Sequence, residues 1–277
     1  MKLSILIPTD FSNNAKSAIN YAIKLYQEQE YTFYFLHAWS VKTNNRTYIT
    51  SNFVDTSKEE AKIKLKDFKN NIESLNANKK HTFKTIFSTN KLIDAIDCNL
   101  KDFSIDQLFM DTKSVTKAKE QWFGSNTVNT IKKINQCPII VVPDEYNFKP
   151  LKQIAFATDY NRHFGDELIT IKTFVKLYDS KLQVVHVCEK NTLTDNQNHN
   201  LTMLQANLSD IPHNFNWMTD ELKKTEEITN FIKLQDIDAL VLINYNHGFI
   251  ENLINEPVIK NVVSYPDVPL LILPYKD

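Results

Sequence analysis

The chain has 277 residues, of which 42% are hydrophobic, 11% aromatic and 23% charged. This length suggests two domains, and this composition is typical of a soluble globular protein with apolar cores. The 32 basic and 33 acidic residues leave a formal net charge of -1, which excludes a global field that would attract nucleic acid or an acidic membrane surface.

No targeting or membrane segment is apparent in the sequence. Pro8 and Asp10 interrupt the short apolar stretch at the N-terminus, and no run of 18 or more apolar residues occurs. Cys98, Cys137 and Cys188 are too widely spaced to form a C-x-x-C pair. We therefore expect a cytoplasmic protein with reduced thiols, no zinc site and no membrane partner.

Glycine is rare in this chain and occurs only as Gly124, Gly165 and Gly248. Glycines so far apart cannot form the G-x-G-x-x-G or the G-x-x-x-x-G-K-S/T motif. The sequence therefore excludes Rossmann dinucleotide binding and P-loop chemistry in their usual forms.

Apolar strands alternate with amphipathic helices from the N-terminus onward. The first strand lies in ILIPTDFS and ends at Thr9-Asp10, and a helix follows with Ser12 as its expected N-cap. A second strand, FYFLHA, contains His37. The next helix is expected from about Ser57, because Ser57 and Glu60 form a capping-box pattern.

The same series of landmarks recurs in the second part of the chain. IAFATDYN repeats the first strand, and its Asp159 lies 149 positions after Asp10. LQVVHV repeats the second strand at the same separation. SIDQLFM and CPIIVVP are repeated by DIDALVL and VPLLILP at separations of 132 and 131. Four landmarks in the same order indicate an internal duplication.

These patterns predict an α/β protein made of two doubly wound domains, residues 1–146 and 151–277. Each domain is expected to contain a mainly parallel five-stranded sheet flanked by helices. In such sheets ligands bind at the carboxyl ends of the strands, near the topological switch point. In the first domain this rule indicates Thr9, Asp10, His37, Ala38, Met110 and Asp111.

The segment after the fourth strand of the first copy reads MDTKSVTKAKEQWFGSNT, from Met110 to Thr127. Together with ILIPTD and CPIIVVP, it resembles the universal stress protein family. In ATP-binding members, the fourth strand is followed by G-x-x-G, nine residues, and then G-S/T. Here Asp111 and Ser114 occupy the first two glycine positions, and Gly124-Ser125 stands at the expected spacing.

The resemblance implies a non-catalytic stress-response regulatory protein that binds ATP with magnesium in its first domain. Asp111 would oppose binding through its charge, whereas Gly124-Ser125 begins a helix whose N–H groups favour an anion. Asp10 is expected to face the nucleoside, to form a turn, or both. The residues expected to contact the nucleotide are Pro8, Thr9, Asp10, Val41, Met110, Asp111, Ser114, Gly124, Ser125 and Asn126.

Two other functions remain open at this point. Loss of both G-x-x-G glycines favours an interaction scaffold of the same fold that binds no nucleotide. An adenylate-forming enzyme is disfavoured, because those enzymes usually carry a glycine- and serine-rich loop after the first strand, where this chain reads TDFSNNAKS. His37 and His186 lack a neighbouring nucleophile in any recognised arrangement, so we expect structural rather than catalytic histidines.

The second copy departs further from the ATP-binding pattern. Glu256 and Pro257 stand where Gly-Ser is expected, which should start a helix well but make a poor phosphate site. Asp159 is expected to be a turn residue. The last strands, residues 139–142 and 270–273, should pair as in dimers of single-domain relatives. The chain would then be an internal pseudo-dimer, and further assembly into a homodimer stays open.

Overall fold

The computed structural model describes residues 3–40, 50–76, 78–112, 125–187, 192–218, 224–245 and 268–275. The strands are β1 (Leu3–Pro8), β2 (Tyr31–Ala38), β3 (His81–Ser88), β4 (Gln107–Asp111), β5 (Ile139–Val142), β6 (Gln153–Ala157), β7 (Lys181–Val187), β8 (His213–Met218), β9 (Ala239–Asn244) and β10 (Leu270–Pro274). The helices are α1 (Asn13–Leu25), α2 (Ser51–Leu75), α3 (Leu92–Asp102), α4 (Ser125–Lys133), α5 (Glu167–Tyr178), α6 (Asp195–Asn207) and α7 (Lys224–Leu234).

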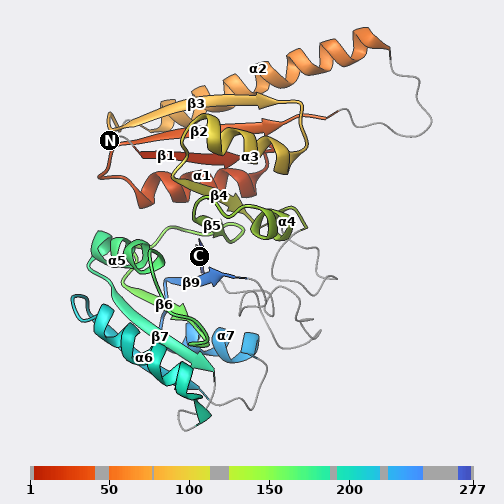
Figure 1. Ribbon diagram of the computed structural model, residues 1–277. Helices are drawn as coiled ribbons and strands as arrows, with labels where there is room; N and C mark the ends of the chain where they lie inside the picture. Colours follow the sequence, from red (N-terminus) through yellow and green to blue (C-terminus); the bar gives the residue numbers. More distant parts are fainter. Residues whose placement is uncertain are drawn as a thin grey trace.

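The strands form one sheet in the order β3-β2-β1-β4-β5-β10-β9-β6-β7-β8 (Figure 1). All strand pairs within β1–β5 are parallel, and so are all pairs within β6–β10. The strand order reverses at β1/β4 in the first half and at β6/β9 in the second. The predicted fold class, two doubly wound α/β units of five strands each, is therefore confirmed.

The two halves of the sheet meet at β5 and β10, the last strand of each series. These strands pair antiparallel, with Leu271 opposite Ile140 and Ile272 opposite Ile139. This is the pairing that the sequence predicted for residues 139–142 and 270–273. Because the pairing is antiparallel, the carboxyl edges of the two parallel halves point in opposite directions.

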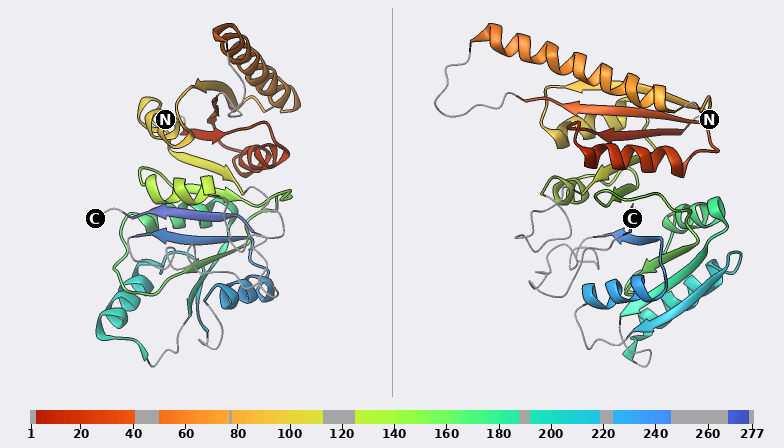
Figure 2. Two further views of the ribbon diagram at one scale, coloured as in Figure 1. Left: turned by 90° about the vertical axis from the view of Figure 1, so that its right-hand side faces the viewer. Right: turned by 180° about the vertical axis from the view of Figure 1, so that it is seen from behind.

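Helices cover both sides of the strands in each half (Figure 2). Successive strand residues alternate between two apolar clusters: Ile5 and Ile7 pack beneath α1 and α2, whereas Leu6 packs beneath α3 and α4. In the second half the corresponding helices are α5 and α6 in the first cluster and α7 in the second. Each cluster contains residues from both halves, so the two cores are continuous across the β5–β10 junction.

Aromatic residues join the halves a second time, beside the segment that connects them. Tyr146 and Phe148 lie 5.7 and 5.6 Å from the ring of Tyr21 in α1. Phe148 also lies 6.1 Å from Tyr178 of α5, whose hydroxyl donates a 2.8 Å hydrogen bond to the carbonyl of Leu25. The connecting segment thus packs between α1 and α5.

The duplicated aspartates Asp106 and Asp238 have the same structural role in both halves. Asp106 Oδ2 accepts a 2.7 Å hydrogen bond from the backbone N–H of Ser4, at the start of β1. Asp238 Oδ2 accepts bonds of 2.7 and 2.9 Å from the N–H groups of Lys152 and Gln153, at the start of β6. Each carboxylate satisfies backbone donors that the sheet leaves open at its amino edge.

One predicted helix start is confirmed and another is wrong. Ser12 caps α1, since its Oγ accepts a 3.2 Å bond from the N–H of Ala15. The second helix, however, begins at Ser51 and not near Ser57. Thr50 is its N-cap and accepts a bond of 3.4 Å from the N–H of Phe53. The Ser57/Glu60 pattern lies inside a helix that had already begun at Ser51.

Replacing Thr50 with alanine is expected to destabilise the protein by about 1 kcal/mol, because the first turn of α2 loses its side-chain acceptor. The matched variant Ser57→Ala should be neutral or slightly stabilising, because alanine has the higher helix propensity inside a helix. Urea unfolding followed by circular dichroism would measure both. A larger loss in Ser57→Ala than in Thr50→Ala would place the start of the helix where the sequence pattern put it.

Candidate functional site

The carboxyl end of β1 turns sharply at Thr9 and Asp10. The N–H of Thr9 bonds the carbonyl of Leu36 in β2 at 2.8 Å, which extends the parallel ladder by one residue. Asp10 is exposed and its Oδ1 accepts a 3.1 Å bond from the N–H of Ser12, so the expected turn-forming role is observed. Phe11 between them has φ 67°, in the left-handed region.

Side chains of α1 and α4 tie the end of β4 to this turn. Asn14 Nδ2 donates a 3.2 Å bond to the carbonyl of Thr112, and Thr127 Oγ1 donates one of the same length to the carbonyl of Asp111. Ser125 and Asn126 begin α4 and are exposed. The structure thus gathers Asp10, Asp111, Ser125 and Asn126 along one edge of the first half, at the switch point between β1 and β4.

The remaining predicted contacts divide into two groups. Pro8, Thr9 and Met110 are buried, and Met110 belongs to the apolar cluster beneath α3 and α4. Val41, Ser114 and Gly124 lie outside the described residues, as do Glu256 and Pro257 of the second copy.

Both strand-end histidines are held in the same way. His37 Nδ1 lies 2.8 Å from the carbonyl oxygen of Thr9, and its ring centroid lies 4.5 Å from that of Phe11. Because a carbonyl oxygen only accepts, Nδ1 carries the proton. His186 repeats the arrangement, with its Nδ1 2.7 Å from the carbonyl of Thr158 and its ring 4.6 Å from Tyr160.

The aromatic partner of each histidine was not predicted from the sequence. Phe11 and Tyr160 directly follow the duplicated Thr-Asp, in TDF and TDY, and Tyr160 has φ 55°. Left-handed backbone aims each ring back over the strand end, where it stacks on the histidine. The duplication of an aromatic residue at this position was the available indication.

Two lysines of α2 lie over aromatic rings at the carboxyl edge of the first half, and one of them, Lys62, is ion-paired with Glu59. Lys64 Nζ lies 4.6 Å from the ring centroid of Phe11, and Lys62 Nζ lies 5.7 Å from that of Phe87. Both are cation–π geometries. The lysines and the rings that they contact lie in different elements of the chain, so no local sequence motif indicated these contacts.

The corresponding edge of the second half is filled by its own side chains. Asp159 Oδ1 accepts a 3.1 Å bond from the N–H of Asn161, which confirms the expected turn, and a 2.6 Å bond from the hydroxyl of Tyr245. Arg162 packs against Tyr245 and Tyr275 in the same crevice. The free volume left there is about 10 Å³, close to the minimum for one water molecule.

A larger hollow of about 530 Å³ lies at the opposite, amino edge of the first half. It separates the C-terminal ends of α1 and α2 near His81. The imidazole of His81 is held by a 3.0 Å contact from Nε2 to the carbonyl of Tyr26 and a 3.2 Å contact from Nδ1 to Asn76. Doubly wound sheets bind ligands at the carboxyl edge, so we place the candidate site there.

Among the residues that the structure describes, no three or more His, Cys, Asp or Glu side chains group closely enough to hold a metal ion. Within the same residues no helix is both long and apolar enough to cross a bilayer.

A model of the universal stress protein family matches residues 1–143, slightly more than half of the chain. The chain belongs to the universal stress protein family. Among curated protein sequences, none matches it.

Solved universal stress protein structures share the fold of this family member over almost its whole length. The crystal structure of a universal stress protein from Archaeoglobus fulgidus has a TM-score of 0.71 at 15% identity, covering 98% of this chain and 97% of that one. A putative universal stress protein from Pseudomonas aeruginosa has a TM-score of 0.59 at 13% identity, covering 98% and 92%. At such identities the likeness shows the fold alone, and it extends over both halves.

Proposed function

We propose that this universal stress protein is a non-catalytic regulatory protein that binds an adenine nucleotide at the carboxyl edge of its first half. The observation that carries the proposal is the difference between the two edges. Asp10, Ser125 and Asn126 are exposed at the switch point of the first half. In the second half the equivalent Asp159 is bonded to Tyr245, and the crevice is filled.

The chemistry of the first edge suits a nucleotide held with magnesium. The first turn of α4 offers backbone N–H groups and the positive end of the helix dipole to phosphate oxygens. Asp10 and Asp111 supply carboxylates, which Mg²⁺ binds together with phosphate oxygens. A magnesium ion would offset the repulsion that Asp111 exerts where the ATP-binding relatives have glycine.

A non-catalytic role is supported by the way the histidines are held. His37 Nδ1 is directed at the carbonyl of Thr9 and the ring stacks on Phe11. An imidazole in this position stabilises the strand end and has no described hydroxyl or thiol partner to activate. We place the protein in the cytoplasm, since its charge is balanced and its cysteines form no disulfide pattern.

A scaffold that binds no nucleotide is the second candidate, and Asp111 favours it. Its carboxylate stands at the first glycine position of the family loop. Without a compensating cation, it would repel phosphates and leave the exposed edge to a partner protein.

Calorimetric titration of ATP and magnesium into the nucleotide-free protein separates the candidates. We expect one site per chain, and Ser125→Glu should abolish it, because a carboxylate at the start of α4 competes with phosphate without weakening the helix. Asn129→Glu, exposed one turn later in α4, carries the same charge change and should still bind.

Bound nucleotide at 100 times its Kd should raise the unfolding free energy by about 2.7 kcal/mol. No heat and no stabilisation at millimolar ATP would leave the scaffold as the better account. Release of pyrophosphate or phosphate with turnover would contradict the non-catalytic part of the proposal.

A further inference from the structure

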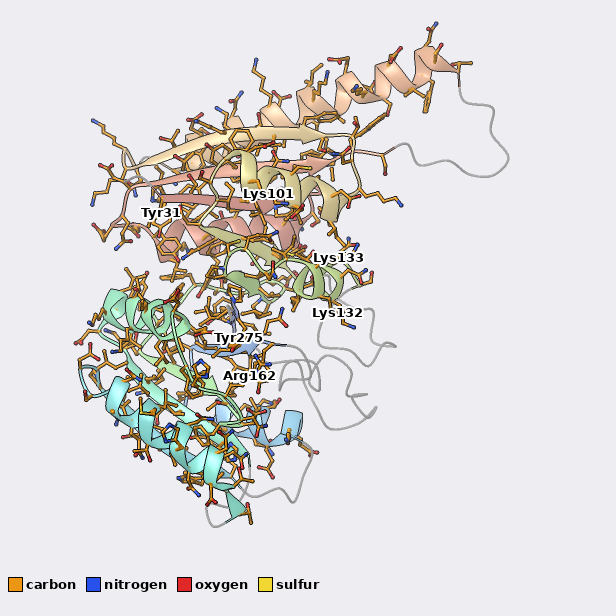
Figure 3. All side chains as sticks on the ribbon, viewed as in Figure 1. Tyr31, Lys101, Lys132, Lys133, Arg162 and Tyr275 are labelled. Atoms are coloured by element: carbon orange, nitrogen blue, oxygen red, sulfur yellow. The ribbon has the colours of Figure 1, made fainter. Side chains whose placement is uncertain are left out.

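Arg162 occupies the crevice at the carboxyl edge of the second half. Its Cζ lies 4.7 Å from the ring centroid of Tyr245 and 4.3 Å from that of Tyr275. The two rings lie 6.3 Å apart at 64° and so form two walls of a corner. Figure 3 shows Arg162 and Tyr275 next to each other in this region. Tyr245 follows β9 and Tyr275 follows β10, so the strand ends fix both walls.

Within the residues that the structure describes, the guanidinium is held by its contacts with these two rings. Arg162 forms no hydrogen bond or ion pair with any residue in the described part of the chain. A guanidinium has five N–H donors. Here its flat faces contact the two rings, and its N–H groups donate no hydrogen bond to a described residue. Such a group can leave the crevice without breaking a buried hydrogen bond.

The charge of the crevice favours a cation. Asp159 and Glu167 line it, together with the exposed His163. Their carboxylates accept bonds from the hydroxyl of Tyr245 at 2.6 Å and from the N–H of Gly165 at 2.9 Å, and neither is neutralised by an ion pair within the described residues. With Arg162 withdrawn, two carboxylates and two tyrosine faces would remain, which attract a cation and repel a phosphate.

We propose that this crevice is an aromatic cage for guanidinium groups, that Arg162 is its internal ligand, and that an arginine side chain from outside the chain can replace it. A planar guanidinium stacks on both rings and is weakly hydrated, whereas an ammonium is compact and strongly hydrated. The inference concerns the second half and stands independently of nucleotide binding in the first.

The test uses Arg162→Ala in the full chain, titrated with methylguanidinium at low millimolar concentration. We expect saturable binding at least tenfold tighter than to the wild-type protein, whose cage is occupied. Methylguanidinium should also raise the melting temperature of Arg162→Ala, and methylammonium should do so much less. Lys233→Ala removes an exposed positive charge from α7 and should show no such rescue, which controls for general effects of the salt.

Further variants identify the walls and the source of the ligand. Adding Tyr275→Leu to Arg162→Ala should remove the binding. An end-capped Gly-Arg-Gly peptide should bind Arg162→Ala more tightly than free arginine does, because Asp159 and Glu167 would repel the carboxylate of free arginine. Free arginine binding as well as the peptide would instead indicate a metabolite as the ligand.

Three results would overturn the cage: equal affinity of Arg162→Ala and wild type for methylguanidinium, equal binding of methylammonium, or binding that survives Tyr275→Leu. Should Arg162→Ala fail to fold, Arg162→Lys retains a cation that stacks less well. Methylguanidinium should then bind Arg162→Lys more tightly than the wild-type protein, and no difference between them would equally contradict the proposal.

Discussion

Replacing Ile140 with alanine is expected to destabilise the whole chain by about 2–5 kcal/mol, the usual cost of deleting a buried aliphatic side chain. Ile140 is 2% exposed in β5 and lies opposite Leu271 of β10. Its apolar cluster contains side chains of α1 in one half and of α5 in the other. The cavity would therefore open where the two halves share a core.

The readout should come from the half that carries no mutation. Trp217 lies in β8 of the second half, so, with Trp39 and Trp122 replaced by phenylalanine, a shift of the fluorescence transition in urea would report transmission through β5 and β10. The matched variant Ile169→Ala removes the same atoms from α5, where Ile169 is 66% exposed, and should change stability by less than about 0.5 kcal/mol. An unchanged Trp217 transition in Ile140→Ala would mean that the halves unfold independently.

Acid is expected to destabilise the second half through His186. Its imidazole is 3% exposed, and burial lowers its pKa, with a smaller contribution from the charge of Lys224. The carbonyl of Thr158 and the charge of Asp159 act in the opposite direction and are outweighed. Nε2 of this ring is buried without a hydrogen-bond partner among the described residues, so nothing there solvates a second proton.

The sign follows from proton binding in the two states. The pKa of His186 is lower in the folded protein than in the unfolded chain, so the unfolded chain binds the proton at the higher pH. The contribution of His186 to stability is therefore complete above the unfolded pKa of about 6.5. It is lost as the pH falls below that value. The slope contributed by one histidine is at most about 1.4 kcal/mol per pH unit. Stability should stop falling on this account once the pH has passed below the folded pKa.

Urea unfolding of the wild-type protein and of His186→Asn between pH 8 and pH 5 measures this contribution. Asparagine keeps an N–H donor near the position of Nδ1 and does not titrate. We expect the wild-type curve to be steeper below pH 6.5, and the two curves to run parallel above pH 7.5, where the imidazole is neutral in both states. Parallel curves throughout would show that His186 is not the titrating group.

The duplication and the alternation of strands with helices were predictable because they depend on local patterns. Short apolar runs such as ILI and VVHV identify buried strands, and Ser12 identifies a helix start, from a few adjacent residues. The carboxyl edge of the first half was also predictable in part. Asp10 and Asp111 follow from the rule that parallel strands bring their ends to one edge, and Ser125 follows from the resemblance to the family loop.

The start of α2 shows where a local pattern misleads. Ser57 and Glu60 satisfy the capping-box spacing, but Thr50 is an equally suitable cap seven residues earlier. Once Thr50 begins the helix, Ser57 has helical residues on both sides. The backbone N–H groups near it already bond within the helix, so none is left to donate to the Ser57 hydroxyl. Which of two competent caps is used depends on where the chain leaves the sheet, and three-dimensional packing decides that.

The sequence by itself determined that this protein is a tandem α/β chain of the universal stress protein type, with the acidic residues of its first switch point in place. Only the tertiary structure decided that the second switch point is filled by Arg162 between Tyr245 and Tyr275, and that Lys64 lies over Phe11. The physical reason is the range of the interactions. Hydrophobic periodicity and capping act between near neighbours in the chain, whereas a cation–π contact joins residues from separate elements and leaves no spacing pattern in the sequence.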